Sequence, residues 1–150
     1  MDTQLDLVRD YVNTLDFETG IDLISTPDEL AMWFSEQGLV DDLVEPTEQE
    51  LVDAHAVREA IRALVLLNNG VEADAAAASK TLEEAGRKAQ LGVRFEDGRP
   101  VLAPADDGTR GAIGRIVAAV ACRWRKLRAF SRLPQTSIEH QARERLRDLS

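Results

Sequence analysis

The segment 47–70 constrains the fold of this chain more than any other. It begins with Thr-Glu-Gln-Glu, a capping box in which the threonine and the last glutamate satisfy backbone groups of the first helical turn. It ends with Asn-Gly, a common helix stop. We therefore predict a long helix here, and its apolar side must be covered by other elements. That side is formed by Ala54, Val57, Ile61, Leu64 and Leu67.

Four further helices are predicted from apolar residues at helical spacing and from capping residues. A Thr-Pro-Asp-Glu segment, for example, gives the second helix an N-cap and a proline at its first position. The last of the four carries an apolar side from Ile113 to Trp124. The expected ranges are about 5–16, 27–38, 72–89, and a helix capped by Asp107 or Thr109 that ends at the latest by Pro134.

A different pattern occupies residues 91–104. Leu91, Val93 and Phe95 alternate with polar or small residues, and an Asp-Gly turn follows. This arrangement predicts a β-hairpin. Near the C-terminus, a third capping box at 136–139 starts an amphipathic helix with Ile138, Ala142, Leu146 and Leu149 on one side. The chain is therefore expected to be α+β: a mostly helical single domain with one hairpin and a C-terminal amphipathic helix.

Composition excludes several classes of protein. A chain of 150 residues with 44% hydrophobic residues has the size of one domain and can build a core. Polar residues interrupt every apolar stretch, so we expect no membrane segment, and the N-terminus does not resemble a signal peptide, which favours the cytoplasm. One cysteine and two histidines cannot complete a four-ligand zinc site, and we expect no metal, cofactor or catalytic residues.

The charge is distributed unevenly along the chain. Residues 1–108 carry 8 basic and 24 acidic residues, whereas 109–150 carry 10 basic and 3 acidic residues. A basic tail on an acidic body can contact nucleic acid weakly through phosphates, or it can fold back onto the body. The candidate nucleic-acid-binding residues are Arg123, Arg125, Lys126, Arg128 and Arg132.

Two segments carry a family resemblance. One reads Tyr-Val-Asn-Thr-Leu-Asp at 11–16, and the other runs from Leu51 through the arginines of the long helix to Asn68-Asn69-Gly70. In their order and spacing they resemble the ABATE domain, a bacterial intracellular module that precedes a CGNR zinc finger in stress-induced transcription regulators. The resemblance covers residues 5–120 and includes the hairpin region. It implies an ABATE-like domain at 1–121 and a basic helical extension at 122–150.

The zinc finger that the resemblance implies departs from the family pattern here. The family's Trp-x-x-Leu-Lys-Ala-Cys segment corresponds to Trp-Arg-Lys-Leu-Arg-Ala-Phe, so Phe130 occupies the position of the first zinc ligand. No cysteine follows, and the Cys-Gly-Asn-Arg sequence is missing. The finger has decayed, has been replaced by a short helix, or is lost through a frameshifted or truncated reading; the capping box after Pro134 favours replacement.

Arg58 and Arg62 are the main candidates for a ligand site. They lie one helical turn apart and border the apolar side of the long helix. Two guanidinium groups can hold a small anion, with hydrogen bonds from nearby asparagine or aspartate side chains. The favoured alternative is a buried structural network in which Arg58 pairs with Asp16 or Asp53. The ligand-binding hypothesis comprises Asn13, Asp16, Arg58, Arg62 and Asn69.

Three other features have a structural interpretation. The glycines at 108, 111 and 114 fit no phosphate-binding pattern and favour close helix packing. His55 lacks a nucleophile partner and is expected to be satisfied or to face solvent, and Cys122 is expected to be buried. The predicted function is a ligand-sensing regulatory domain rather than an enzyme. The alternative is a structural or partner-binding homodimer subunit that uses the C-terminal helix.

Overall fold

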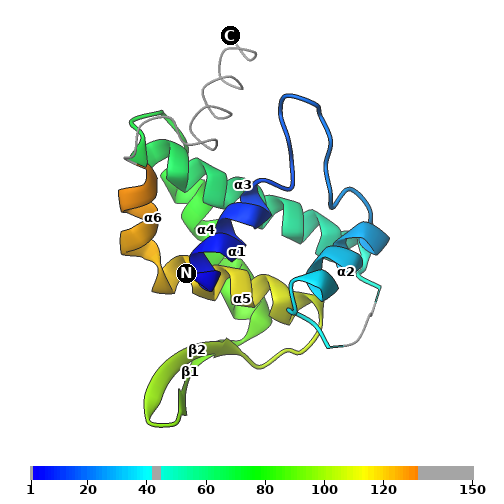
Figure 1. The fold of residues 1–150 in the computed structure, drawn as a ribbon, viewed down its shortest axis with the longest axis vertical. Coiled ribbons are helices and arrows are strands. Elements are labelled where there is room, and N and C mark those ends of the chain that lie inside the picture. Colours follow the sequence, from blue (N-terminus) through cyan, green and yellow to red (C-terminus); the bar gives the residue numbers. More distant parts are fainter. Residues whose placement is uncertain (1, 42–44, 132–150) are drawn as a thin grey trace.

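The computed structural model describes residues 2–41 and 45–131, which form six helices and one two-stranded sheet (Figure 1). This confirms the α+β class with a helical majority, whereas the helix predicted after Pro134 lies outside the described residues. The elements are α1 (Thr3–Val12), α2 (Pro27–Glu36), α3 (Glu48–Asn68), α4 (Ala75–Ala89), β1 (Leu91–Glu96), β2 (Arg99–Pro104), α5 (Thr109–Cys122) and α6 (Trp124–Ser131).

Helix α3 is the centre of the fold and contacts all five other helices of the described part. Its capping box is confirmed: Thr47 Oγ1 accepts from the backbone N–H of Glu50, and the Glu50 carboxylate accepts from the N–H of Thr47. The predicted apolar side is buried as far as Ile61. Beyond Ile61, the buried residue is Val65, four positions further along the helix. Leu64, three positions after Ile61, and Leu67 are only half-buried.

The core lies between α1, α2, α3 and α5. Tyr11 on α1 is fully buried, and its hydroxyl donates to the backbone carbonyl of Ala54 on α3. Burial raises the pKa of Tyr11 above its ordinary value, so the phenol stays neutral. Trp33 of α2 packs on the Tyr11 ring with centroids 5.5 Å apart. These contacts join α1, α2 and α3.

Helix α5 is closely packed at two of its glycines, Gly114 against the end of α4 and Gly111 against the loop before α5, as the sequence predicts. A Cβ on Gly114 would lie 2.3 Å from the Cβ of Ala89, and one on Gly111 would lie 1.8 Å from the backbone oxygen of Asp106. The predicted caps are wrong, because Gly108 is the N-cap of α5 and makes no side-chain hydrogen bond there. The turn is held instead by Asp106, whose Oδ1 accepts from the N–H of Gly108 at 2.7 Å.

The hairpin of β1 and β2 projects beyond the helices (Figure 1). Its turn residues Asp97 and Gly98 have φ of 53° and 77°, the left-handed pair that a two-residue hairpin turn requires. After the hairpin, the single helix predicted up to Pro134 is divided: α5 ends at Cys122 and α6 begins at Trp124. The division leaves Cys122 exposed, which corrects the expectation that it is buried.

Candidate functional site

The loop between α1 and α2 folds back over the middle of α3. Helix α1 ends at Val12, four residues earlier than predicted, because Leu15 forms an antiparallel bridge with Asp22 instead of a helical turn. The N–H of Leu23 donates to the carbonyl of Thr14 at 2.8 Å, which closes the loop on itself. Asp22 is thereby placed against α3.

Arg58 holds this loop through a two-pronged ion pair. Its Nη1 and Nη2 donate to Oδ1 and Oδ2 of Asp22 at 2.9 and 3.1 Å, and its Nε donates to Glu59 at 3.0 Å. Its side chain is 4% exposed. The predicted pairing with Asp16 or Asp53 is therefore wrong, although the structural network itself is confirmed. Burial alone would lower the pKa of Arg58, but the Asp22 and Glu59 carboxylates raise it above its ordinary value.

Arg62 joins α3 to the end of α1. Its Nη2 donates to the carbonyl of Val12 at 2.8 Å, which satisfies one of the carbonyls left open at the end of that helix. The guanidinium also lies 4.2 Å from the ring centroid of Phe17 in the loop, and Nε lies 3.3 Å from Glu59. Arg62 therefore connects α3 both to the end of α1, at Val12, and to the following loop, at Phe17.

The structure brings together part of the predicted ligand set. Asn13 follows Val12 directly, and its Oδ1 is buried without a hydrogen-bond partner among the described residues. Asp16 turns toward its own loop, where Oδ1 accepts from the N–H of Glu18 at 2.9 Å. Asn69 is the C-cap of α3, about two turns beyond Arg62. An anion site at Arg58 stays a prediction, and any anion there would have to compete with Asp22.

His55 lies beside the same network. Its Nε2 donates to the carbonyl of Ile24 at 2.6 Å and lies 3.9 Å from Oδ2 of Asp22. The side chain is thus satisfied, as the sequence analysis expected. It adds a third link between α3 and the loop.

Acidic pH is expected to weaken the attachment of the loop between α1 and α2 to α3. Burial would raise the pKa of Asp22, but hydrogen bonds from Arg58 and from the N–H of Ile24 hold it below the ordinary value. Because the folded-state pKa is the lower one, Asp22 stabilises the fold above about pH 4 and loses this effect as the pH falls further. In urea titrations from pH 6 to pH 3, the Asp22→Asn variant should show a shallower loss of stability than the wild type. Parallel pH profiles would contradict this.

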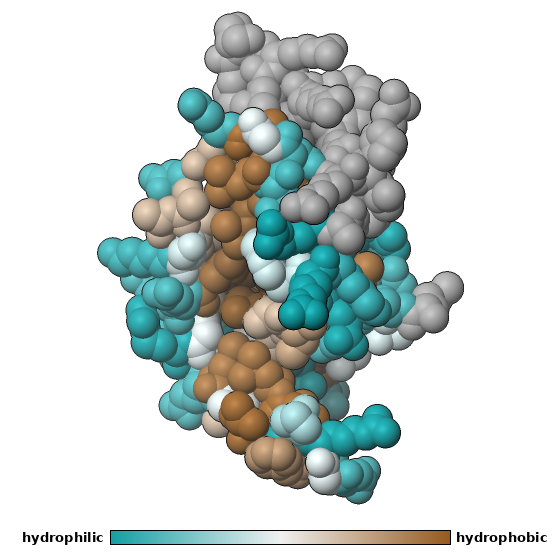
Figure 2. Space-filling model, turned by 90° about the vertical axis from the view of Figure 1, so that its left-hand side faces the viewer, coloured by the Kyte–Doolittle hydropathy of each residue, from teal (hydrophilic) through white to brown (hydrophobic). Residues whose placement is uncertain are grey.

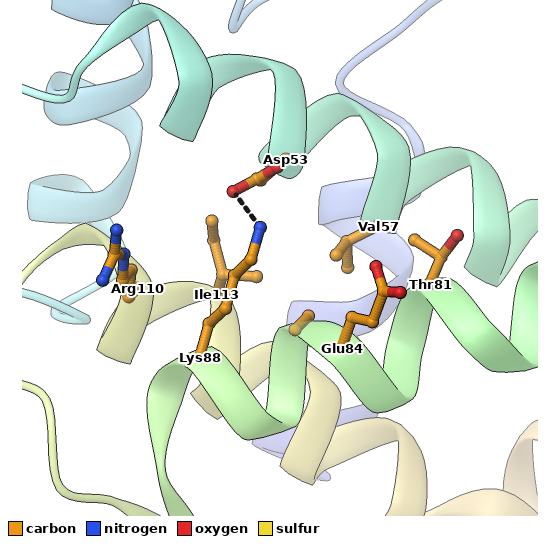
Figure 3. A pocket seen from close by; sticks show the side chains of 8 residues that line it. Asp53, Val57, Thr81, Glu84, Lys88, Arg110 and Ile113 are labelled. Carbon is orange, nitrogen blue, oxygen red and sulfur yellow. Dashed lines mark hydrogen bonds and ion pairs between the residues drawn. The ribbon is translucent and has the colours of Figure 1, made fainter.

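A separate pocket lies between α3, α4 and α5 (Figure 3). Its apolar floor consists of Val57, Ala85 and Ile113, all buried. Its volume is about 50 Å³, several times the roughly 10–15 Å³ that a cavity needs to hold one water molecule. The rim is polar and combines both signs of charge: Asp53 from α3, Thr81, Glu84 and Lys88 from α4, and Arg110 from α5.

The rim charges differ in how they are neutralised. Lys88 reaches from α4 to α3, and its Nζ donates to Asp53 at 3.0 Å (Figure 3). Arg110 lies 4.0 Å from Glu50 and is more than half exposed. Glu84 is exposed, lies on the side of the pocket next to Val57 (Figure 3), and has no ion pair or hydrogen bond with any described side chain. The pocket therefore offers one uncompensated carboxylate and one loosely held guanidinium above an apolar floor.

This pocket is not predicted from the sequence. Glu84 and Lys88 are four residues apart and share one side of α4, which was a usable local signal. Asp53 and Arg110 come from two other helices, however, and only the packing of α3 and α5 against α4 brings them to the same rim.

The basic candidates of the C-terminal part lie partly against the N-terminus. Arg123 and Lys126 donate to the two carboxylate oxygens of Asp2 at 3.0 and 2.8 Å. The hydrogen bond from Lys126, more than any other contact, holds the pKa of Asp2 well below its ordinary value. Arg125 and Arg128 are exposed on α6, and Arg132 lies outside the described residues. This ion-pair cluster offers an internal partner for two of the predicted nucleic-acid contacts.

Comparison with known families decides the relationship. A family model matches residues 5–127, from α1 into α6. The chain belongs to the ABATE family. The family is described as "putative stress-induced transcription regulator". No curated protein and no solved structure matches the chain significantly.

The ABATE match includes the buried Leu127 on α6. The boundary placed after residue 121 remains a prediction, and the missing zinc finger is likewise an inference from the sequence. Among the described helices, none has the length and apolar character needed to cross a membrane.

Proposed function

We propose that this ABATE-family chain is the ligand-sensing part of a regulator, and that a small zwitterion binds in the pocket between α3, α4 and α5. The observation that carries the proposal is the rim of opposite charges around an apolar floor, with Glu84 uncompensated. A single-charge ligand would meet a like charge on this rim. A zwitterion can place its ammonium near Glu84 and its carboxylate near Lys88, the rim cation that lies between Glu84 and Arg110 (Figure 3).

The volume of the pocket limits the ligand. A cavity of about 50 Å³ accepts a compact apolar group, such as a methyl, while the charged groups of the ligand stay between the rim side chains. The class that fits is a small α-amino acid or a molecule of the same pattern. Apolar contact with Val57 and Ile113 then adds to the charge recognition.

The position of the pocket suits a sensor. Three helices line it, so a ligand that contacts all three favours the arrangement in which they are packed together. α5 leads directly to α6 and the basic C-terminal part, where a response could be passed on. Because the chain has one cysteine, we do not propose zinc-dependent DNA recognition. A cytoplasmic location is expected.

The test is thermal stabilisation by alanine and by analogues that lack one charge. L-alanine at about 100 times its Kd should stabilise the fold by about 2.7 kcal/mol, which corresponds to roughly 5–10 °C in Tm. Ethylamine and propionate, each missing one charged group, should stabilise far less. A panel of larger amino acids measures how much side chain the cavity accepts.

Two variants distinguish binding in the pocket from a nonspecific effect of the amino acid on stability. Glu84→Gln should weaken binding roughly tenfold because it removes a charge-assisted contact. Glu83→Gln is the matched control, since Glu83 is an exposed neighbour on α4 that does not line the pocket. Equal stabilisation of both variants, or of wild type by propionate and ethylamine alike, would contradict the proposal.

A further inference from the structure

The hairpin presents an apolar face that the described part of the chain covers only at its base. The register places Leu91 opposite Pro104, Val93 opposite Leu102, and Phe95 opposite Pro100, so these six side chains share one face. Pro104 is buried against the helices, but Val93 is 68% and Phe95 73% exposed. Figure 2 shows apolar surface at the end of the molecule where the hairpin projects.

The two edges of the hairpin are not equivalent. The two-residue turn makes Glu96 and Arg99 a hydrogen-bonded pair, so the backbone groups of Val93 and Phe95 point away from β2. On the outer edge of β2 the corresponding positions include Pro100 and Pro104, which have no N–H. Within the described residues the sheet contains β1 and β2 alone. The outer edge of β1 can therefore accept another strand, and that of β2 is blocked.

We propose that β1 pairs with β1 of a second copy of this chain in an antiparallel arrangement about a two-fold axis. A two-stranded hairpin is marginally stable by itself, and an open edge with exposed apolar residues favours pairing. A four-stranded sheet across two copies satisfies the N–H and carbonyl groups of Phe95, which pair with those of the partner's Phe95. It also places Phe95 beside the partner's Phe95 on the shared apolar face.

The charges on the opposite face select the register. With Phe95 at the two-fold axis, Arg94 lies opposite the partner's Glu96, and the symmetry repeats this pair. A shift of the strands by two residues in one direction would oppose Arg94 to the partner's Arg94. A shift in the other direction would oppose Glu96 to the partner's Glu96. Of these three registers, only the one centred on Phe95 brings opposite charges together.

The same charges argue against nucleic acid as the occupant. The hairpin carries Glu96 and Asp97 together with Arg94 and Arg99, so it has no net charge of its own, and the chain as a whole has a net charge of −9. A phosphate backbone therefore meets no positively charged surface at the hairpin. A second copy instead meets the acidic group with Arg94.

Sedimentation velocity of the full chain tests the interface. Because two short strands make a small contact, the protein should be studied from about 10 µM to about 1 mM. The wild type should dimerise, and Arg94→Glu or Glu96→Arg alone should raise the Kd roughly tenfold, since each variant opposes like charges in both symmetric pairs. Mixing the two variants should restore association, because a copy whose β1 carries only acidic charges then meets a copy whose β1 carries only basic ones.

The mixing experiment also controls for folding, since a variant that had lost its hairpin could not regain association. Arg115→Glu is a second control: it reverses an exposed charge on α5 rather than on β1, and should leave the dimer unchanged. A wild type that stays monomeric over the whole range would overturn the proposal. A dimer that persists equally in both single variants would overturn it too, because another surface must then form the interface.

Discussion

Replacing Arg58 with methionine is expected to lower the free energy of unfolding by about 3 kcal/mol. The substitution keeps much of the side-chain volume but removes the donors that hold Asp22 and Glu59, and it leaves the half-buried Asp22 carboxylate without its partner. Loss of the network should also free the loop between α1 and α2 from α3. Urea denaturation followed by tryptophan fluorescence measures the change.

Arg9→Met provides the comparison. Arg9 forms an ion pair with Asp6 at 2.6 Å, a closer approach than that of Arg58 to Asp22, but both groups are substantially exposed. Its removal should change the stability by less than about 0.5 kcal/mol. If the two substitutions had equal effects, the buried network would not be what fixes the loop.

Gly111→Ala is expected to destabilise the protein by about 2 kcal/mol or more. The new Cβ would lie 1.8 Å from the backbone oxygen of Asp106, and a backbone atom cannot turn aside as a flexible side chain can. The turn before α5 would have to move, and Arg110 at the pocket rim would move with it. Chemical denaturation gives the magnitude.

Gly86→Ala is the matched substitution in a neighbouring helix. Its Cβ would meet Cδ1 of Leu91 at 3.4 Å, an ordinary contact with a side chain that can adjust. Because alanine is favoured over glycine inside helices, this variant should gain up to about 1 kcal/mol. The two variants should therefore change the stability in opposite directions, and a gain in stability for Gly111→Ala would contradict the close contact between Gly111 and Asp106.

Local chemistry made much of the fold predictable. The caps at Thr26 and Thr47 act within a few residues, so the starts of α2 and α3 can be read from the sequence. The Asp-Gly turn likewise determined the hairpin. The end of α1 was not predictable in this way, because Leu15 fits a helical pattern and leaves it only to pair with Asp22, which the folded loop brings back.

The candidate sites were harder to predict from the sequence, because their residues come from distant segments of the chain. Arg58 and Arg62 were singled out correctly as arginines beside the core, yet the partner of Arg58 lies 36 residues away and has no local signal. The pocket depends on three helices, and neither Asp53 nor Arg110 differs in the sequence from an ordinary surface charge. The partner of Arg58 and the residues around the pocket are both determined by tertiary packing, which the spacing of residues in the sequence does not reveal.

An amide NMR titration of the full chain with L-alanine locates the binding site directly. We expect shifts concentrated at the residues of the pocket on α3, α4 and α5, around Asp53, Glu84 and Arg110, and their loss in Glu84→Gln. Shifts centred instead on Arg58, Arg62 and the loop between α1 and α2 would place binding at the arginine network and contradict the pocket. Unchanged spectra at saturating L-alanine would contradict the proposed ligand class.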